Sequence, residues 1–264
     1  MKLIFFGAGY CSKYIIPILD KKFQIICTHN EKIRPEIFDK DCNVTRITFK
    51  EFTNNVNLIK DATHVINSIP PINGKDLVYE FLISLKNQTY NSIKWFCYLS
   101  STSVYGNHCG RWVDEKTIIR PKTLRGKSRK NVEDLFLRFY NKKKIPLHIF
   151  RLPGIYGPGR SALDKLIKKN KMVIRKKNQY FSRIHVEDIA SAIICSMNKV
   201  TPGEIFNITD NYPCSADKVT KYAARLLNIK DLNYVDIDSS EINYKIKDFY
   251  SDNKKVSNKK IKKY

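Results

Sequence analysis

The chain has 264 residues, 42% of them hydrophobic, and its 48 Lys and Arg against 25 Asp and Glu give a formal net charge of +23. This length suffices for one large domain or two small ones. No apolar run is long enough to span a membrane, so a soluble protein without a membrane partner is expected. The seven cysteines include no C-x-x-C pair and indicate neither a disulfide framework nor a zinc site, so no metal site is predicted.

Residues 1–19 read MKLIFFGAGYCSKYIIPIL, which is typical of a strand, a glycine turn and a helix in direct succession. Gly7 allows a tight turn, Gly9 leaves room for a phosphate group beside the backbone, and the N-terminus of the following helix favours an anion. Ser12 occupies the place of the third glycine of G-x-G-x-x-G, while Pro17 predicts a kink or an early end of the helix. The pattern predicts a dinucleotide site whose pyrophosphate lies against Gly7, Gly9, Tyr10, Cys11 and Ser12.

Residues 23–28 form a second apolar strand, and the residues after it determine which nicotinamide cofactor fits. An acid at this place hydrogen-bonds the ribose hydroxyls of NAD, whereas basic groups accommodate the 2′-phosphate of NADP. The sequence THNEKIR at residues 28–34 places no acid at the strand end. NADP is therefore favoured, and Glu31 leaves NAD open. The residues expected at this end of the cofactor are Thr28, His29, Lys32 and Arg34.

The alternation of strands and helices continues along the chain. Residues 44–49 and 63–69 predict a third and a fourth strand, residues 75–85 a helix, and residues 93–99 a fifth strand. The pair Pro70-Pro71 ends the fourth strand at the carboxyl edge, where ligands bind in open α/β sheets. This order predicts an α/β fold with a doubly wound parallel sheet. Ser68, Ile69 and Pro70 are expected beside the cofactor.

The fifth strand leads directly into a hydroxyl-rich loop, SSTSVYG at residues 100–106, at the same edge of the sheet. A hydroxyl group there can hydrogen-bond a carbonyl or alcohol oxygen that undergoes hydride transfer. The alternative is an ordinary polar turn, since Ser and Thr are common in loops.

Five segments resemble the short-chain dehydrogenase/reductase superfamily, specifically its extended and atypical branch, which includes nucleotide-sugar epimerases and dehydratases. They are GAGYCS at 7–12, YLSSTSVYG at 98–106, RLPGIYGPGR at 151–160, SRIHVEDIA at 182–190 and FNITD at 206–210. WVDE at 112–115 and FYSDNKKVSN at 249–258 further resemble a bacterial subgroup of oxidoreductase or epimerase-like proteins. The resemblance implies a Rossmann-type sheet in residues 1–152. It also implies a smaller C-terminal substrate lobe in residues 153–264, partly interleaved with the sheet.

The resemblance also implies roles for residues of the loop and of the helix after it. Ser101 would hydrogen-bond the reacting oxygen, with Ser100 on the cofactor side and Thr102 on the substrate side. The Tyr-x-x-x-Lys pair of the family falls on Arg125 and Arg129, so the tyrosine that transfers the proton is missing.

Arginine stays protonated at any working pH, so Arg125 cannot act as a general acid or base, but it can bind an anion or polarise a carbonyl group. Arg129 can clamp ribose or phosphate with two parallel hydrogen bonds. Tyr105 is the available phenol, although the tyrosine at its place in the family is usually not the catalytic one.

A second departure from the family lies at Gly154, where sugar-nucleotide enzymes often have asparagine, and it weakens the inference of a nucleotide-sugar substrate. Arg160 ends the rigid turn GPGR at residues 157–160. Its cation can meet a substrate phosphate or carboxylate, or it can simply keep the loop soluble; both interpretations stay open.

The predicted function is that of an NAD(P)-dependent oxidoreductase or epimerase-like enzyme for a small hydroxyl or carbonyl substrate, with a sugar-derived substrate left open. One alternative is a cofactor-binding sensor or scaffold without turnover. A second, less favoured alternative is a nucleic-acid-binding protein that uses the basic charge. The lysine clusters are spread along the chain without RNA-recognition aromatics beside them, which favours compositional bias as their origin.

The N-terminal residues bear on the cellular location of the protein. Lys2 and the apolar run after it do not make a signal peptide, because Gly7 ends the run and no small-residue cleavage site follows. A cytoplasmic protein is therefore expected. A homodimer is left open, and the C-terminal lobe could be shorter than in relatives, which commonly continue further.

Overall fold

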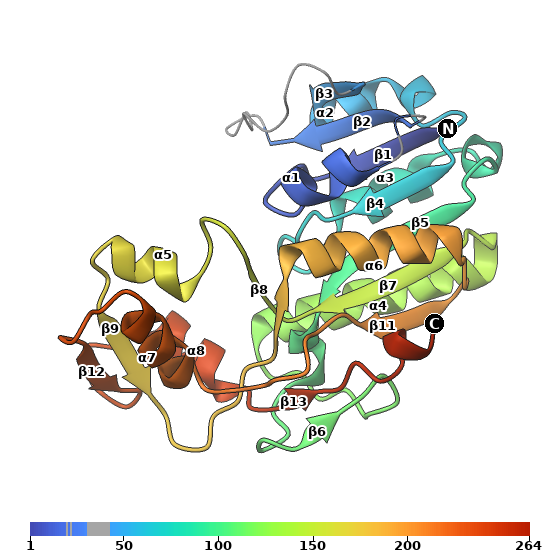
Figure 1. Cartoon of the computed structure of the whole chain (residues 1–264). Helices are drawn as coiled ribbons and strands as arrows, with labels where there is room; N and C mark the ends of the chain where they lie inside the picture. The colour runs from blue at the N-terminus through green and yellow to red at the C-terminus, as the bar shows by residue number, and fades with distance from the viewer. Residues whose placement is uncertain (20, 22, 31–42) are drawn as a thin grey trace.

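The computed structural model describes residues 1–19, 21, 23–30 and 43–264, and its centre is one parallel sheet (Figure 1). The sheet order is β11-β7-β5-β4-β1-β2-β3, and every neighbouring pair is parallel. The strands are β1 (Lys2–Phe6), β2 (Gln24–His29), β3 (Val44–Thr48), β4 (His64–Asn67), β5 (Trp95–Ser101), β7 (Leu147–Leu152) and β11 (Glu204–Asn207). The predicted doubly wound Rossmann-type fold is confirmed.

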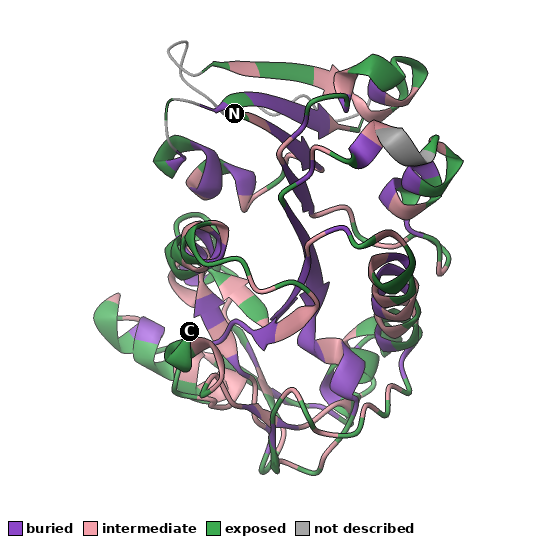
Figure 2. Cartoon of the chain, turned by 90° about the vertical axis from the view of Figure 1, so that its right-hand side faces the viewer, coloured by how far each residue is buried: buried purple, intermediate pink, exposed green. Residues whose placement is uncertain are grey.

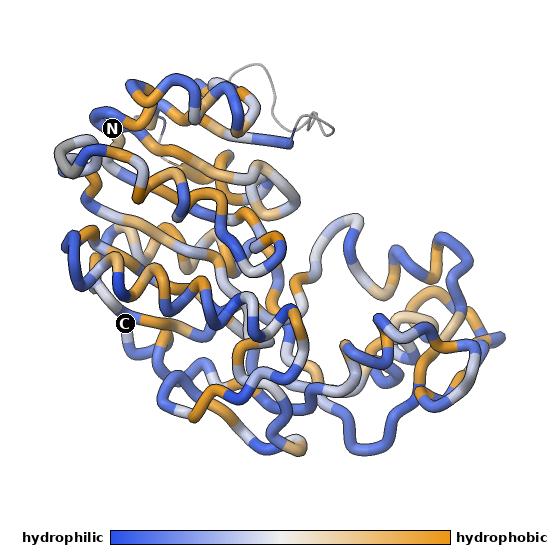
Figure 3. Tube along the Cα trace, turned by 180° about the vertical axis from the view of Figure 1, so that it is seen from behind, coloured by the Kyte–Doolittle hydropathy of each residue, from blue (hydrophilic) through white to orange (hydrophobic). Residues whose placement is uncertain are grey.

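Helices cover both faces of this sheet, and the alternation within β1 shows why (Figure 2). Leu3 and Phe5 point to one face, where α1 (Ser12–Ile15) and α6 (Val186–Asn198) pack. Ile4 and Phe6 point to the other face, which α2 (Phe49–Asn54), α3 (Leu77–Ser84) and α4 (Leu124–Lys143) cover. The central strands are buried on both faces and are therefore mostly hydrophobic, with polar exceptions such as His148 and Arg151 in β7. Orange stretches accordingly run through the sheet in Figure 3.

The elements expected from the sequence occur with small shifts. α1 stops after one turn at Ile15, and the chain continues as a 3₁₀ helix over Ile16–Ile18 that contains Pro17. The early end agrees with the inability of proline to donate the next hydrogen bond. Further 3₁₀ helices in the described part of the chain span Val56–Leu58, Asn87–Tyr90, Thr102–Tyr105 and Ile261–Lys263.

After Leu152 the chain leaves the sheet and builds a smaller region. In it β8 (Gly154–Tyr156) pairs with β10 (Arg183–His185), and β9 (Met172–Arg175) pairs with β12 (Asn233–Asp236). Its last strand, β13 (Lys255–Val256), pairs with β6 (Trp112–Val113), which precedes Leu152 in the chain. Its helices are α5 (Ala162–Ile167), α7 (Ala216–Leu226) and α8 (Tyr244–Ser251). α6 and β11 follow residue 152 in the chain but belong to the main sheet and its helices, so the chain passes more than once between the sheet and the smaller region. The division into separate domains at residue 152 stays a prediction. Within the described residues no helix combines the length and the apolar character needed to cross a membrane.

Candidate functional site

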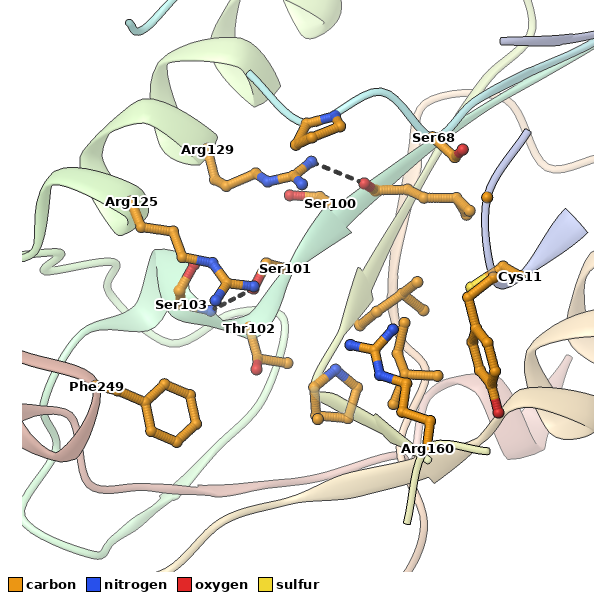
Figure 4. Close-up of a pocket in the computed structure, with 18 of the residues that line it drawn as sticks. Cys11, Ser68, Ser100, Ser101, Thr102, Ser103, Arg125, Arg129, Arg160 and Phe249 are labelled. Carbon is orange, nitrogen blue, oxygen red and sulfur yellow. Dashed lines mark hydrogen bonds between the residues drawn. The ribbon is translucent and has the colours of Figure 1, made fainter. Parts of the chain in front are cut away.

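A cavity of about 1430 Å³ opens at the carboxyl ends of β1, β2, β4 and β5 (Figure 4). On the sheet side it is lined by residues 7–11, 28–30, 68–70 and 99–103, and on the other side by residues of the smaller region. Strands β1 and β4 are neighbours in the sheet, but β1 leads to α1 on one face and β4 leads to α3 on the other. Ligands of doubly wound sheets bind at such a point.

The glycine turn after β1 is held by hydrogen bonds from its neighbours. The Gly7 amide donates to Thr28 Oγ1 (3.2 Å), the Ala8 amide donates to the Thr28 main-chain oxygen (2.7 Å), and Ser68 Oγ donates to the Gly7 oxygen (2.6 Å). Gly7 has φ +85°, and a Cβ there would lie 2.9 Å from Ile69 Cγ1. Thr28, Ser68 and Ile69 therefore brace the turn besides lining the cavity.

Gly9 differs from Gly7, because nothing in the protein requires a glycine there. Its backbone angle is ordinary, and the nearest atom to a Cβ placed on it would be the Gly7 oxygen at 3.8 Å. Gly9 is exposed toward the cavity, so the space above it suits a phosphate group that approaches the backbone. Ser12 is fully buried and donates to the Gly9 oxygen (2.7 Å), so it supports the turn from below without lining the cavity. The turn and cavity fit a dinucleotide.

The far end of the cavity lies beyond β2 and β3. His29 and Asn30 line it, together with Thr48 and Lys50. Lys32 and Arg34, predicted for this end, and Glu31 lie outside the described residues. Sequence analysis missed Lys50; the signal was its position just after the third strand, at the same edge as His29. The carboxylates among the described lining residues, Asp248 and Asp252, both come from the C-terminal part of the chain.

The hydroxyl-rich loop forms a 3₁₀ helix (Thr102–Tyr105) that starts at the end of β5. Ser101 Oγ caps it by accepting from the Ser103 amide (3.2 Å), and Ser101 and Thr102 both line the cavity. Ser100 also lines the cavity, but its hydroxyl donates to Glu133 Oε1 (2.6 Å), away from a ligand. The hydroxyl groups of the loop that can meet a substrate are therefore those of Ser101, Thr102 and Ser103, which all line the cavity.

Helix α4 brings two arginines to this loop because it begins in direct contact with it. Thr123 caps the helix by accepting from the Gly126 amide (3.1 Å), and a Cβ on Gly126 would lie 2.6 Å from the Ser103 oxygen. Only glycine allows this approach. Arg125 and Arg129 consequently line the cavity beside Ser101, as Figure 4 shows.

The cavity is lined by Arg125, Arg129 and Arg160, and also by Arg183 of β10. Arg129 Nη1 donates to the Tyr98 hydroxyl and to the Leu99 oxygen, both at 3.0 Å. Arg160 lies over the Tyr10 ring, 5.3 Å from its centre, so this arginine and Tyr10 close the cavity beside the glycine turn. Cys11 and Pro70 also line the cavity.

The buried carboxylate of Asp76 interacts with the charge of Arg129, but it makes no ion pair with Arg125, Arg129 or Arg160. Burial, and then the charges of Arg129 and Arg160, lower the pKa of Arg125. Within the described residues none of the three forms an ion pair with a carboxylate. Such an arrangement is stabilised by an anion.

Tyr105 does not replace the missing tyrosine. It is fully buried outside the cavity, where its hydroxyl donates to Asn207 Oδ1 (2.8 Å) and accepts from Arg151 Nη1 (3.0 Å). Burial raises its pKa to about 12. The suggestion that Tyr105 supplies a catalytic phenol is therefore corrected: its side chain belongs to a buried polar network and cannot reach a substrate.

The smaller region contributes groups that sequence analysis missed. Phe249, 54% exposed, lies against the Phe181 ring with 5.1 Å between centres and 9° between planes. Lys254 lines the cavity although it is 8% exposed, and it pairs with Asp252 (3.3 Å). Burial lowers the pKa of Lys254. The sequence could have indicated these groups, because Phe249, Asp252 and Lys254 all lie in the segment FYSDNKKVSN at residues 249–258. That segment entered the sequence analysis only as a mark of family resemblance, without a chemical role.

Similarity to known proteins agrees with this geometry. Residues 80–209 match the model of the NAD dependent epimerase/dehydratase family. A solved structure of a functionally unknown conserved protein from Silicibacter pomeroyi DSS is 35% identical, with a TM-score of 0.88 over 99% of this chain and 91% of that chain. A dTDP-glucose 4,6-dehydratase from Bacillus anthracis str. Ames in complex with NAD is 21% identical, with a TM-score of 0.79 over 100% of this chain and 89% of that chain, and it shows the shared fold.

Curated relatives point to the same family. A dTDP-D-glucose 4,6-dehydratase from Dictyostelium discoideum is 26% identical over 86% of this chain, and the match spans 61% of that protein. The match to the mouse protein of the same description spans 47% of its length at 25% identity over 61% of this chain. The fold, the glycine turn at the switch point and these similarities lead to one conclusion: residues 80–209 carry a domain of the NAD dependent epimerase/dehydratase family.

Proposed function

We propose that the chain is an NADP(H)-dependent oxidoreductase or epimerase-like enzyme that acts on a small hydroxyl or carbonyl compound. The observation that carries the proposal is that the glycine turn and the Ser101 hydroxyl line one cavity at the switch point of the sheet. His29 and Lys50 at the far end, with Lys32 and Arg34 from the sequence, favour the 2′-phosphate of NADP over NAD. The dehydratase relatives support a sugar-derived substrate.

Each group in the cavity has a role in this proposal. The amides of the turn around Gly7 and Gly9 bind the pyrophosphate. Arg129, oriented by Tyr98 and by the Leu99 oxygen, binds the ribose. Ser101 donates a hydrogen bond to the reacting oxygen and orients it. When bound, the nicotinamide supplies the hydride acceptor or donor.

Calorimetric titration with NADPH and NADH in parallel tests the cofactor assignment. We expect tighter binding of NADPH; equal affinities would contradict the assignment of the basic groups to the 2′-phosphate. Failure of both cofactors to bind would contradict the proposed function.

Substitution of Ser101 tests the catalytic assignment. Ser101→Ala is expected to lower turnover of a carbonyl substrate by about 10²-fold and to leave NADPH affinity unchanged, because the hydroxyl group acts on the reacting oxygen. Ser191→Ala is a matched control, since Ser191 is exposed on α6 and its hydroxyl donates to the Glu187 oxygen. Unchanged turnover in Ser101→Ala would remove Ser101 from the reaction.

A second candidate, a cofactor-binding protein without turnover, is favoured by one observation. Arg125 occupies the place where the family resemblance expects the proton-transferring tyrosine, and Tyr105 is buried elsewhere. Tight NADPH binding together with no NADPH oxidation across a panel of sugar-derived and simple carbonyl compounds would support this candidate over the enzyme.

A further inference from the structure

Arg125 lines the cavity at the start of α4, next to the hydroxyl-rich loop. Within the described residues, no hydrogen bond or ion pair ties its guanidinium group to another side chain or to the backbone. Arg129 is held by Tyr98 and the Leu99 oxygen, and Arg160 lies over Tyr10. Five N–H donors of Arg125 are therefore free to bind a ligand.

The surroundings of Arg125 select the charge of that ligand. The described lining of the cavity has two carboxylates, Asp248 and Asp252, against eight basic side chains: Lys50, Arg125, Arg129, Arg160, Lys165, Arg183, Lys245 and Lys254. Burial, and after it the repulsion from the cations of Arg129 and Arg160, lower the pKa of Arg125. An anion beside Arg125 relieves this repulsion and gains bidentate hydrogen bonds.

A second polar group lies at the same place. Ser103 Oγ is buried and has no hydrogen-bond partner, which is costly unless a ligand or water completes it. Ser103 borders the start of α4, where its main-chain oxygen would meet a Cβ on Gly126, the residue after Arg125. In Figure 4 the Arg125 side chain extends toward Ser101 and Ser103.

The cofactor has other partners for its own phosphates. The glycine turn and Arg160, which lies over Tyr10, are at the pyrophosphate end of the cavity. His29 and Lys50 are at the far end. Arg125 instead borders the hydroxyl group assigned to the reacting oxygen.

We propose that Arg125 binds an anionic group of the substrate, a carboxylate or a phosphate, beside the Ser101 hydroxyl. The inference rests on the proposed function and narrows its substrate class to small hydroxy or oxo acids and phosphorylated hydroxyl or carbonyl compounds. The guanidinium group then selects and positions the substrate at the place where the family resemblance expects a proton donor.

Calorimetric titration of the NADPH-saturated protein with malonate and with inorganic phosphate tests this proposal and separates the two anions. We expect one of them to bind, and Arg125→Gln to weaken that binding about 10- to 100-fold because a charge-assisted bidentate contact is lost. Arg125→Lys should bind the anion with intermediate affinity, since lysine keeps the positive charge but cannot make two parallel hydrogen bonds as a guanidinium group does. Ser103→Ala should weaken binding a few-fold.

The control is Arg138→Gln, which removes an exposed arginine of the same helix that does not line the cavity. It should bind both the anion and NADPH as the unmodified protein does. NADPH affinity should also be unchanged in Arg125→Gln.

Three results would overturn the proposal: anion binding unchanged in Arg125→Gln, no binding of either anion to the unmodified protein, or an equal loss of NADPH affinity in Arg125→Gln, which would make Arg125 a cofactor ligand. Failure of NADPH to bind the unmodified protein would contradict the proposed function instead. The anion titrations of the cofactor-free protein and its Arg125→Gln variant would still decide the role of Arg125.

Discussion

Gly7 and Gly9 stand two residues apart in one turn, yet different physical requirements act on them. Gly7 has a positive φ and no room for a side chain, so the protein itself requires glycine there. At Gly9 the backbone angle is ordinary, and a Cβ would have only the Gly7 oxygen, at 3.8 Å, as a neighbour within 4 Å. Folding therefore requires glycine at position 7 but not at position 9, where we expect the proposed binding of a phosphate group to require it.

Alanine substitutions separate these two requirements. Gly9→Ala should leave the melting temperature unchanged or slightly higher, since alanine restricts the unfolded chain, but should weaken NADPH binding at least tenfold because its methyl group occupies the space for the phosphate. Gly7→Ala should destabilise the protein by about 1–3 kcal/mol. Thermal melts and calorimetry of both variants measure the two effects. Normal NADPH affinity in Gly9→Ala would show that the phosphate does not approach Gly9.

At the scale of single residues, the sequence predicted a position in the cavity best for residues that directly follow a strand. The residues around Gly7 and Ser101 line the cavity as expected because each follows a strand of the sheet directly. Tyr105 differs, because the 3₁₀ helix over Thr102–Tyr105 turns its ring away from the cavity and toward Arg151 and Asn207. The direction of a side chain after a turn depends on backbone angles that the sequence pattern does not specify.

Helix α4 joins the loop of the site to the core through a buried ion pair. Arg151 of β7 donates to both oxygens of Glu133, with Nε at 3.1 and 3.2 Å and Nη2 at 2.7 Å, and Ser100 of β5 donates to the same carboxylate. Both charged side chains are 2% exposed. The pair connects α4 with two strands and holds the helix that carries Arg125 and Arg129.

Removal of one charge of this pair should be costly. Glu133→Gln leaves Arg151 buried without its counter-charge and is expected to lower the free energy of unfolding by about 3–5 kcal/mol. Asp134→Asn is the matched control, because Asp134 pairs with Lys130 on the same helix where both side chains are 40% exposed, and it should cost less than about 1 kcal/mol. Urea denaturation measures both variants. If both variants lowered the free energy of unfolding equally, the buried pair of Glu133 and Arg151 would stabilise the fold no more than the exposed pair does.

The whole molecule contains two buried histidines that should make its stability dependent on pH. Burial is the main cause that lowers the pKa of His64 and of His148 to about 4. His148 is fully buried, and its Nε2 accepts from the Thr201 amide (2.9 Å), which only the neutral ring can do. Folding therefore keeps both rings neutral at pH values where the unfolded chain protonates them.

Stability should fall as the solution is acidified. In the unfolded chain a histidine takes up its proton near pH 6.5, whereas in the folded chain it does so near pH 4, so the unfolded state binds more protons between these values. The free energy of unfolding is expected to drop by roughly 1 kcal/mol per histidine for each pH unit below about 6.5. Urea denaturation at pH 7.0, 6.0 and 5.0 measures the slope.

His148→Gln is the variant for this experiment, because an amide oxygen can accept from Thr201 but does not titrate. It should lose about half of the pH dependence between pH 6.5 and 5. The same stability at pH 7 and pH 5 in the unmodified protein would show that these rings are protonated in the folded state.

The sequence by itself determined the parallel α/β sheet, the glycine turn and the edge at which ligands bind, because these depend on local patterns: hydrophobic strands, proline and glycine at their ends, and strands that alternate with helices. Only the tertiary structure decided that Arg125, Arg129 and Arg160 share one cavity, that Glu133 pairs with Arg151, and that Lys254 is buried beside Asp252. Arg160 and Lys254 lie far along the chain from the loop at Ser101, and their approach depends on how the smaller region crosses back over the sheet. Such contacts are set by packing between elements, which no short stretch of sequence contains.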